Sequence, residues 1–261
     1  METIKLNPKR MSVQIQRLLI MMVAIIVASM TITACLEDEN SDENNEENGG
    51  NGGGGVAGKR LKSSLTTCSA PGFVNSRSEL TYNSDGTVKR SDTYDASSSK
   101  LLNYFINTNN PDGTFGKVVM YESDNTKVME DTYYYNSNKT IQKFLSAYFQ
   151  NGVKVQTVIH EFTYDNRRKI SQKYYQEGQS AYGELTYNYD ASGRRTTTDL
   201  KYYSFDPNMV LSMTYTRTYN SDGTLQKVTY PYSFVDDTPI TVTFTWENGK
   251  TTYDFDMYNP W

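Results

Sequence analysis

The chain has few of the residues that most catalytic and metal-binding sites use. Among its 261 residues there is one histidine, His160, and there are two cysteines, Cys35 and Cys68. A histidine-based triad with a second histidine, or a histidine-rich metal site, therefore cannot be assembled from this sequence. Two cysteines allow at most one internal disulfide, and none if one of them is modified.

Two further absences concern the fold and the partners. No stretch after the first 35 residues shows a sustained helical period, and the one long apolar run is residues 18–28, LLIMMVAIIVA. That run is short for a membrane-spanning helix, which needs roughly 20 residues. The net charge is −4, the excess acid lies in residues 36–55, and the charges of the remaining body balance. We expect no nucleic-acid partner, because that function needs a basic stripe.

Residues 1–34 have the organisation of a secretory signal peptide. Basic residues come first, the apolar run follows, and small residues lead to Cys35. The motif Ile32-Thr33-Ala34-Cys35 resembles the lipobox of bacterial lipoproteins, in which the signal is cleaved before the cysteine and the cysteine is acylated. The resemblance implies lipidation at Cys35 and hence a membrane partner through the lipid, since several acyl chains on one residue give stable anchoring.

The next segment predicts a disordered tether. Residues 36–55 read LEDENSDENNEENGGNGGGG, with seven acids, no base and no aromatic residue. Such a composition buries too little apolar surface to offset chain entropy, so we assign residues 35–56 to a lipid-anchored tether and residues 57–261 to the folded domain. The acidic cluster at residues 37–39 resembles the export signal of surface lipoproteins in one large Gram-negative phylum. The resemblance implies the outer membrane, facing the cell surface.

A repeated turn sequence indicates the fold of the domain. Residues 82–87 and 219–224 both read YNSDGT, and looser versions recur between them. Asn, Asp, Ser and Gly suit the tight turns of hairpins. The segments between turns alternate apolar and polar residues, as in VLSMTYTRTY and ITVTFTW, which is typical of strands. We predict an all-β, antiparallel meander of about 12–14 strands, arranged as a rolled single sheet or a partly open barrel.

The array resembles the tyrosine–aspartate (YD) repeats of Rhs and teneurin-type proteins. Their units read roughly Tyr-Asp-x-x-Gly-Arg-Leu, and residues 189–195, YDASGRR, match best within a resemblance that covers residues 79–250. That family builds long spiral shells from very many strands. This chain has too few strands to enclose a cargo, so we do not expect the shell function. It also resembles repeat-bearing lipoproteins of the same phylum.

The sequence predicts no catalytic residue, no metal site and no cofactor, and hence no enzyme. His160 lies on a predicted strand, and Glu161 beside it faces the other side of that strand. The aspartates lie where turns need them, as at Asp85 and Asp222, and no loop has the spacing of a calcium-binding hand. No acid–base partner stands near Cys68 in the sequence.

Aromatic ladders are the best functional candidates. Several tyrosines recur at alternate positions of a strand and so share one face. The ligand-binding candidates are Tyr133, Tyr135, Tyr187, Tyr189, Tyr230 and Tyr232. Two interpretations stay open: the ladders pack the inside of the rolled sheet, or they form an exposed stacking platform for a glycan or protein.

Two functional hypotheses follow from these features. The first is a non-catalytic surface lipoprotein that binds an extracellular ligand, either a glycan or a protein. The alternative is a structural or envelope-assembly lipoprotein without a small ligand. A membrane-embedded barrel is a weaker interpretation, because segments such as VKRSDTY carry too many charges for a lipid-facing band.

The lipobox resemblance gives the first testable prediction. Cys35→Ser removes the acylated thiol, so the variant should take up no labelled palmitate and should leave the membrane fraction. Fractionation with radiolabelling of wild type and variant measures both effects. Continued labelling of the variant, with retention in the membrane, would contradict the assignment of the anchor.

Overall fold

The computed structural model describes residues 58–165, 168–203, 210–234 and 236–249. These residues form fourteen strands and no helix, and each strand pairs antiparallel with its neighbours in sequence. The first seven strands are β1 (Lys59–Cys68), β2 (Ser76–Tyr82), β3 (Val88–Asp95), β4 (Leu101–Asn109), β5 (Phe115–Glu122), β6 (Lys127–Tyr135) and β7 (Ile141–Gln150). The remaining strands are β8 (Val153–Asp165), β9 (Arg168–Gln176), β10 (Gly183–Tyr189), β11 (Arg195–Tyr203), β12 (Val210–Tyr219), β13 (Leu225–Ser233) and β14 (Asp236–Asn248).

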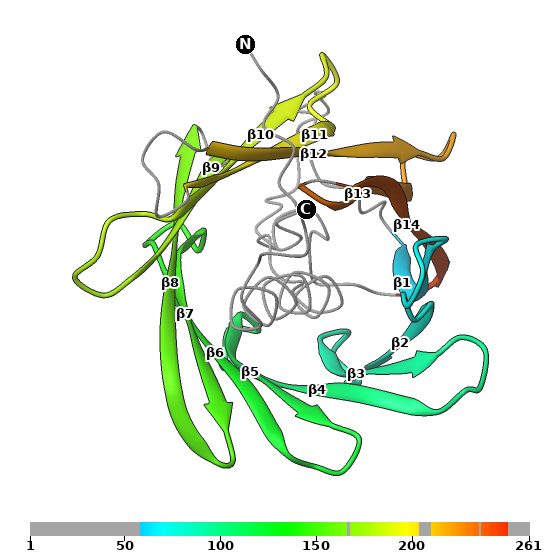
Figure 1. Cartoon of the computed structure of the whole chain (residues 1–261), viewed down its shortest axis with the longest axis horizontal. Helices are drawn as coiled ribbons and strands as arrows, with labels where there is room; N and C mark the ends of the chain where they lie inside the picture. The colour runs from blue at the N-terminus through cyan, green and yellow to red at the C-terminus, as the bar shows by residue number, and fades with distance from the viewer. Residues whose placement is uncertain (1–57, 166–167, 204–209, 235, 250–261) are drawn as a thin grey trace, which may run out of the picture.

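The meander closes on itself (Figure 1). Strand β1 pairs with β14 from Lys59 opposite Asn248 to Cys68 opposite Ile240, which completes a closed barrel. The predicted all-β antiparallel meander is therefore confirmed, and the barrel is closed rather than partly open. Closure removes both sheet edges, which would otherwise present unpaired backbone groups to other chains.

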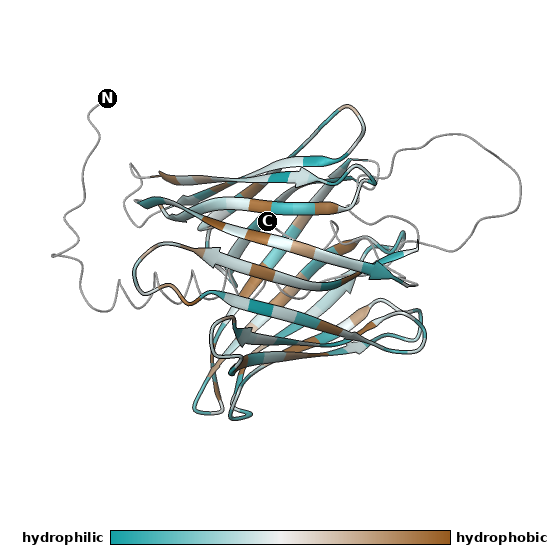
Figure 2. Cartoon of the chain, turned by 90° about the vertical axis from the view of Figure 1, so that its right-hand side faces the viewer, coloured by the Kyte–Doolittle hydropathy of each residue, from teal (hydrophilic) through white to brown (hydrophobic). Residues whose placement is uncertain are grey.

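Strand alternation separates an inner face from an outer face. In β12, Met213, Tyr215 and Arg217 are buried, whereas Thr214 and Thr216 between them are exposed. The same period of two runs through the other strands, and Figure 2 shows the resulting alternation of hydropathy along them. Aromatic and aliphatic side chains thus point inward, and threonines and charged residues cover much of the outside.

The apolar core has two parts on the inner wall. One cluster runs from Val88 on β3 to Ile141 on β7 and is centred on Phe105 and Phe115. The other runs from Leu185 on β10 round to β14 and across to β1. About eight strands give a barrel that wall side chains can fill, and the diameter grows with strand number. Fourteen strands therefore make a wider barrel, and its apolar core is divided into these two clusters on the wall.

One end of the barrel, which we call the regular rim, carries near-identical turns. They occupy residues 83–87, 110–114, 136–140, 190–194 and 220–224, each after an even-numbered strand. In the first, the Asn83 side-chain amide donates to the Thr87 hydroxyl, which donates to a carboxylate oxygen of Asp85 at 2.7 Å. The turns at residues 110–114 and 220–224 make the same bonds.

Position four of these turns requires a positive φ. Gly86, Gly113 and Gly223 have φ values of 88°, 82° and 85°, and Lys139 adopts 65° in the turn at residues 136–140. Glycine reaches this region without a Cβ penalty, which explains its use here. The YNSDGT string recurs because these turns share one hydrogen-bonded conformation, with a positive φ at the fourth position.

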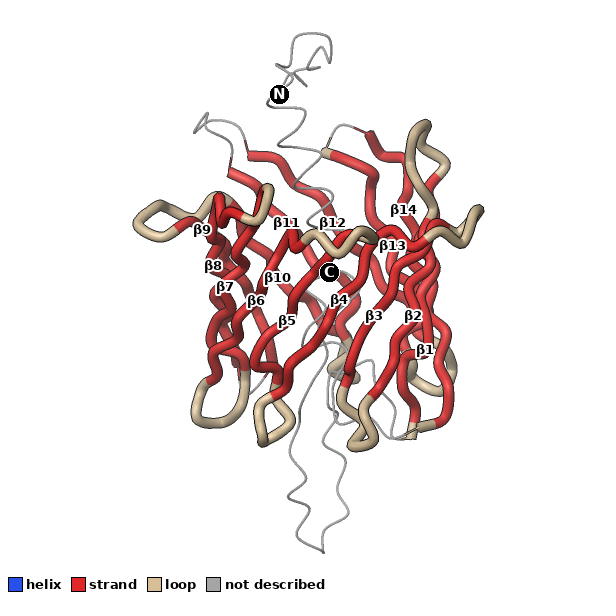
Figure 3. The backbone as a smooth tube through the Cα atoms, turned by 90° about the horizontal axis from the view of Figure 1, so that it is seen from below, coloured by secondary structure: helices blue, strands red, loops and turns tan. Residues whose placement is uncertain are grey.

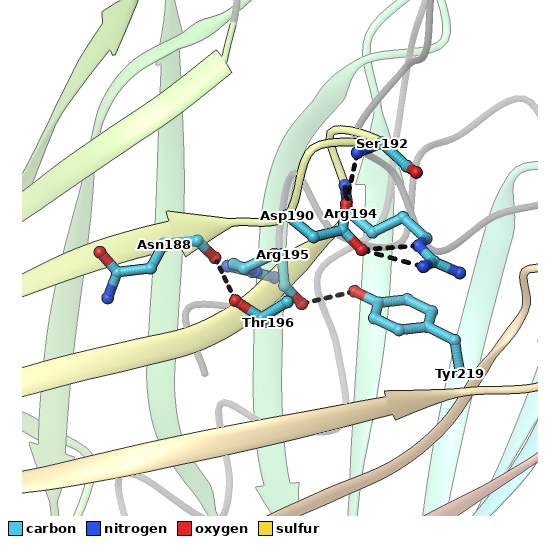
Figure 4. A network of polar contacts seen from close by, with 7 residues as sticks. All are labelled: Asn188, Asp190, Ser192, Arg194, Arg195, Thr196 and Tyr219. Carbon is cyan, nitrogen blue, oxygen red and sulfur yellow. Dashed lines mark hydrogen bonds and ion pairs between the residues drawn. The ribbon is translucent and has the colours of Figure 1, made fainter.

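Aromatic side chains join neighbouring turns around this rim. Four tyrosines that directly precede a turn, and Trp246 near the end of β14, each donate a hydrogen bond to a backbone carbonyl at or near the start of the adjacent strand. The pairs are Tyr82 with Leu61, Tyr135 with Phe115, Tyr189 with Lys169, Tyr219 with Arg195, and Trp246 with Leu225. Figure 4 shows Tyr219 directed at the Arg195 carbonyl, beside the turn that Asp190 closes through Ser192 and Arg194.

The opposite end, which we call the variable rim, has connections of unequal length (Figure 3). They comprise residues 69–75, 96–100, 123–126, 151–152 and 177–182 in the described part of the chain. Strand β1 begins at Lys59 on the regular rim, so the segment that precedes the domain joins the barrel at that rim.

Candidate functional site

All six tyrosines predicted as ligand-binding residues lie on the inner face. Tyr133, Tyr187 and Tyr230 are only 4–6% exposed and belong to the two core clusters. Tyr135 and Tyr189 are half-buried at the regular rim, where both make the carbonyl hydrogen bonds described above. Tyr232 is half-buried near the variable rim and meets Phe73 edge-on at 6.0 Å.

A larger aromatic array crosses the inner wall, and we call it the aromatic belt. Successive rings lie 4.2–6.3 Å apart, centroid to centroid. Its members are Phe115, Tyr133, Phe144, His160, Tyr174, Tyr182, Tyr202 and Phe234. It begins among the buried rings of β5 and β6 and ends with half-buried rings at the variable rim.

The rings nearest the variable rim form the part that we call the distal belt: Tyr174, Tyr182, Tyr202 and Phe234. Backbone hydrogen bonds position the second of these, because Tyr182 donates to the carbonyl of Tyr174 and accepts from the amide of Tyr203. Tyr174 and Tyr182 meet edge-on at 5.2 Å with an interplanar angle of 77°. Tyr182 and Tyr202 meet at 6.3 Å and 67°. Edge-to-face pairs of this kind are favourable arrangements for aromatic rings.

His160 lies at the centre of the aromatic belt in a defined tautomer. The Tyr187 hydroxyl donates to the Gln172 side-chain carbonyl at 2.7 Å, so the Gln172 amide nitrogen donates to His160 Nδ1 at 2.9 Å. The proton of the neutral ring is therefore on Nε2. Burial lowers the pKa of His160 to about 3, which keeps it uncharged near neutral pH. The ring stacks on Phe144 at 4.2 Å.

A buried acid lies on the neighbouring inner wall. Asp131 on β6 accepts a hydrogen bond from the Ser146 hydroxyl on β7 at 2.6 Å and is 5% exposed. Burial raises the pKa of Asp131 to about 7, and the hydrogen bonds from Ser146 and Tyr133 oppose that rise. This inward acid could not be predicted from the sequence, because it lies in the middle of a strand, outside the turn pattern.

Three cations also point inward, toward the regular rim. Lys169, Arg195 and Arg217 on β9, β11 and β12 are at most 5% exposed. The Lys169 ammonium lies 5.3 Å from the centre of the Tyr187 ring, and the Arg195 guanidinium lies 5.0 Å from it. Arg217 donates to the Thr198 hydroxyl. Such polar side chains can lie on the inner wall because a wide barrel holds them beside its apolar clusters.

The outer wall carries a row of alternating charge. Register places neighbours on five consecutive strands, β7 to β11, in the order Lys143, Glu161, Lys173, Glu184 and Lys201. Opposite charges directly across neighbouring strands stabilise a sheet modestly. The prediction that Glu161 and His160 face opposite sides is confirmed, since Glu161 belongs to this outer row.

The turn aspartates are separate from one another. Each of Asp85, Asp112 and Asp222 bonds the threonine two residues later in its own turn. Those hydrogen bonds lower the pKa of all three carboxyls. Within the described residues, no three His, Cys, Asp or Glu side chains gather into a group that could hold a metal ion.

The two cysteines fall in different parts of the chain. Cys68 is a half-buried free thiol at the end of β1. Cys35, the predicted signal peptide and the whole of the predicted tether lie outside the described residues. Among those residues, no helix is long and apolar enough to cross a membrane.

Comparison with known proteins gives distant structural likenesses. No protein-family model matches this chain, and no curated protein matches it. A porin-like protein from Bacteroides uniformis is similar in structure, with a TM-score of 0.41 and 12% identity over 72% of this chain and 98% of that one. A chain of the TcdB2-TccC3-Cdc42 structure has a TM-score of 0.28 and 14% identity over 70% of this chain, which spans 12% of that chain. These likenesses assign no activity.

The buried acid predicts a pH-dependent stability. The folded protein holds the Asp131 proton to about pH 7, whereas the unfolded chain releases it near pH 4. Because the folded protein binds this proton more tightly than the unfolded chain, protonation of Asp131 stabilises the fold. This stabilisation is fully present below pH 4 and is lost as pH rises to about 7, a change in the free energy of unfolding on the order of 4 kcal/mol. Asp131→Asn should remove that loss and keep the acceptor for Ser146.

Urea unfolding of wild type and Asp131→Asn from pH 4 to pH 9 checks this prediction. The variant should gain stability relative to wild type between pH 4 and pH 7, and the gain should be constant above pH 7. The difference between the two proteins isolates Asp131 from His160, whose lowered pKa gives the opposite pH dependence. A difference that does not change with pH would contradict the raised pKa.

Proposed function

We propose that this chain is a non-catalytic, lipid-anchored protein of the bacterial outer membrane that binds an extracellular ligand inside the variable rim of its barrel. The observation that carries the proposal is the distal belt. Four half-buried rings and the Phe73–Tyr232 pair gather at one end of the inner wall. Binding sites for small ligands are concave and rich in aromatic residues with few polar groups.

The direction of the barrel supports this proposal. The chain enters the domain at Lys59 on the regular rim, after the acidic segment that follows Cys35. A lipid on Cys35 would hold the regular rim toward the membrane and leave the variable rim turned away from it. The variable rim then meets extracellular molecules first. Loops that differ in length on a regular scaffold are the usual place for binding residues.

The outer wall favours a domain that stands in water. A membrane-spanning barrel presents an apolar band outward and polar side chains inward. Here the outer face carries the charged row from Lys143 to Lys201, and a second polar network in which Asn188 and Thr214 both donate to Asp199. Lipid attachment through Cys35, rather than insertion of the barrel, fits this polarity.

The arrangement of titratable groups favours binding without turnover. General acid–base catalysis needs a group that titrates near the working pH within reach of a reacting atom. His160 stays neutral because burial lowers its pKa, and its ring partners are Phe144 and Tyr174. Asp131 does titrate near pH 7, but the side chains that hydrogen-bond to it are Ser146 and Tyr133, with no second carboxylate among them.

A binding screen tests the proposal. The full chain, purified in detergent, is presented to an array of glycans and to proteins of the extracellular medium. We expect a ligand whose signal falls at least about tenfold with Tyr232→Ala, since an aromatic anchor is worth about 1.4 kcal/mol or more. The matched control is Tyr134→Ala, which removes a tyrosine of the outer face that is 42% exposed.

Three outcomes would count against the proposal. No ligand in the screen, together with one dominant crosslinked envelope protein in cells, would favour the structural alternative. Equal loss with Tyr134→Ala would place the ligand on the outer wall. Hydrolysis of a glycoside, ester or peptide substrate that disappears with His160→Ala would show an enzyme.

A further inference from the structure

We propose that the distal belt binds a neutral carbohydrate chain, with the Nε2–H group of His160 as a polar anchor at the inner end of the site. This inference rests on the proposed function, since it names the ligand class for the same rim. It is carried by the geometry of four rings, by a glycine that makes room for one of them, and by a hydrogen-bond donor on the inner wall.

The distal belt offers a curved aromatic surface along the inside of the barrel. Tyr174, Tyr182, Tyr202 and Phe234 come from β9, from the connection before β10, from β11 and from the residue after β13. Each residue is half-buried and so keeps part of its surface exposed near the variable rim. Neighbouring centroids are 5.2, 6.3 and 6.1 Å apart. Consecutive sugar rings present apolar C–H faces that such rings can contact, while their hydroxyls stay toward water.

Gly183 leaves space on the inner face of β10 for the Tyr174 ring. A Cβ atom on Gly183 would lie 1.9 Å from Cζ and 2.0 Å from the hydroxyl oxygen of Tyr174. The phenol ring therefore lies directly over the strand where any other residue would place its side chain. A glycine inside a strand often marks such a close approach, and here it fixes the direction of the ring.

His160 supplies the polar part of the site. Its ring centroid is 6.0 Å from that of Tyr174, so it continues the distal belt inward. The Gln172 amide occupies Nδ1, which leaves the proton on Nε2. Within the described residues Nε2 is buried and has no hydrogen-bond partner. A buried donor without an acceptor costs free energy, and a sugar hydroxyl or ring oxygen is an acceptor of suitable chemistry.

The inner wall of β9–β13 beside the distal belt is uncharged. On this side of Gln172 the inward side chains of these strands are apolar or aromatic, apart from Gly183 and the neutral amide Gln176, which pairs with the buried Val158. The inward acid Asp131 belongs to β6, outside these strands. Burial raises the pKa of Tyr174 and Tyr182, so their phenols are neutral donors at any physiological pH. The inward cations lie toward the regular rim instead. A neutral ligand therefore fits this part of the wall better than an anionic one.

Titration calorimetry of the full chain in detergent tests the inference. The probes are cellohexaose, maltohexaose, xylohexaose and mannohexaose, with a heparin hexasaccharide as the anionic comparator. At least one neutral hexasaccharide should bind with a Kd below about 1 mM, and heparin more weakly. Tyr182→Ala and Tyr202→Ala should each raise that Kd about tenfold, whereas Tyr202→Phe should keep it near wild type because the ring remains.

Two further variants examine the polar anchor and the glycine. His160→Phe keeps the ring stack on Phe144 but removes the Nε2–H donor, and it should raise the Kd about tenfold. Gly183→Ala displaces the Tyr174 ring and should also weaken binding. Tyr134→Ala, on the outer face, should leave the Kd unchanged. Thermal unfolding of each variant confirms that the barrel is intact, and Tyr182→Ala changes a connection rather than a strand.

The contradicting results are distinct for the two proposals. Neutral hexasaccharides that bind equally to wild type, Tyr182→Ala and Tyr202→Ala would overturn the assignment of the distal belt, and so would binding of heparin alone. A protein ligand that depends on Tyr232, with no neutral hexasaccharide bound, would overturn this inference and leave the proposed function standing. Absence of any ligand in both experiments would overturn both.

Discussion

Hydrogen bonds between neighbouring turns of the regular rim are the constraint on which the barrel depends. Most of these turns are closed by hydrogen bonds among their own side chains and backbone, as Asn83, Asp85 and Thr87 show. At the same rim adjacent strands separate into different turns; Arg195, for example, lies beyond the pairing of β11 with β12, which begins at Thr197. A tyrosine just before a turn, or Trp246 near the end of β14, donates to a carbonyl near the start of the adjacent strand, as Tyr219 does to Arg195 at 2.7 Å. A β-bulge at each such tyrosine, for example between Thr218 and Tyr219, turns its ring inward toward that carbonyl. The YNSDGT string therefore supplies three side-chain hydrogen bonds within a turn and one, from its tyrosine, to the adjacent strand.

Because the regular rim closes the barrel in this way, the connections at the variable rim can differ in length and sequence. They do differ in length, and the half-buried rings of the distal belt gather at that rim. Both proposals assign binding to this rim for that reason. The two ends of the barrel thus differ in the role of their aromatic residues. Tyrosines of the regular rim, such as Tyr135 and Tyr189, donate hydrogen bonds to backbone carbonyls. Rings of the distal belt, such as Tyr202, are the ones to which we assign ligand binding.

Much of the fold could be predicted from the sequence, and less of the site. Turn residues and the period of two are local signals, so an antiparallel meander of about 12–14 strands could be predicted. Closure could not, because it depends on the pairing of Lys59 with Asn248 at opposite ends of the domain. The alternate tyrosines indicated one shared face, but not which of them would be buried like Tyr133 and which half-buried like Tyr232. Gln172 and Asp131 had no signal, because their roles come from neighbours on other strands.

The most direct test of the rim bonds is the free energy of unfolding of Tyr219→Phe, measured in urea beside Tyr134→Phe. The first variant keeps the ring and removes only the hydroxyl, so the Arg195 carbonyl loses the donor that Tyr219 supplies. The account predicts a loss of about 1–3 kcal/mol for Tyr219→Phe and a change within about 0.5 kcal/mol for the exposed Tyr134→Phe. Equal, small changes in both variants would contradict the claim that these hydrogen bonds hold neighbouring turns together.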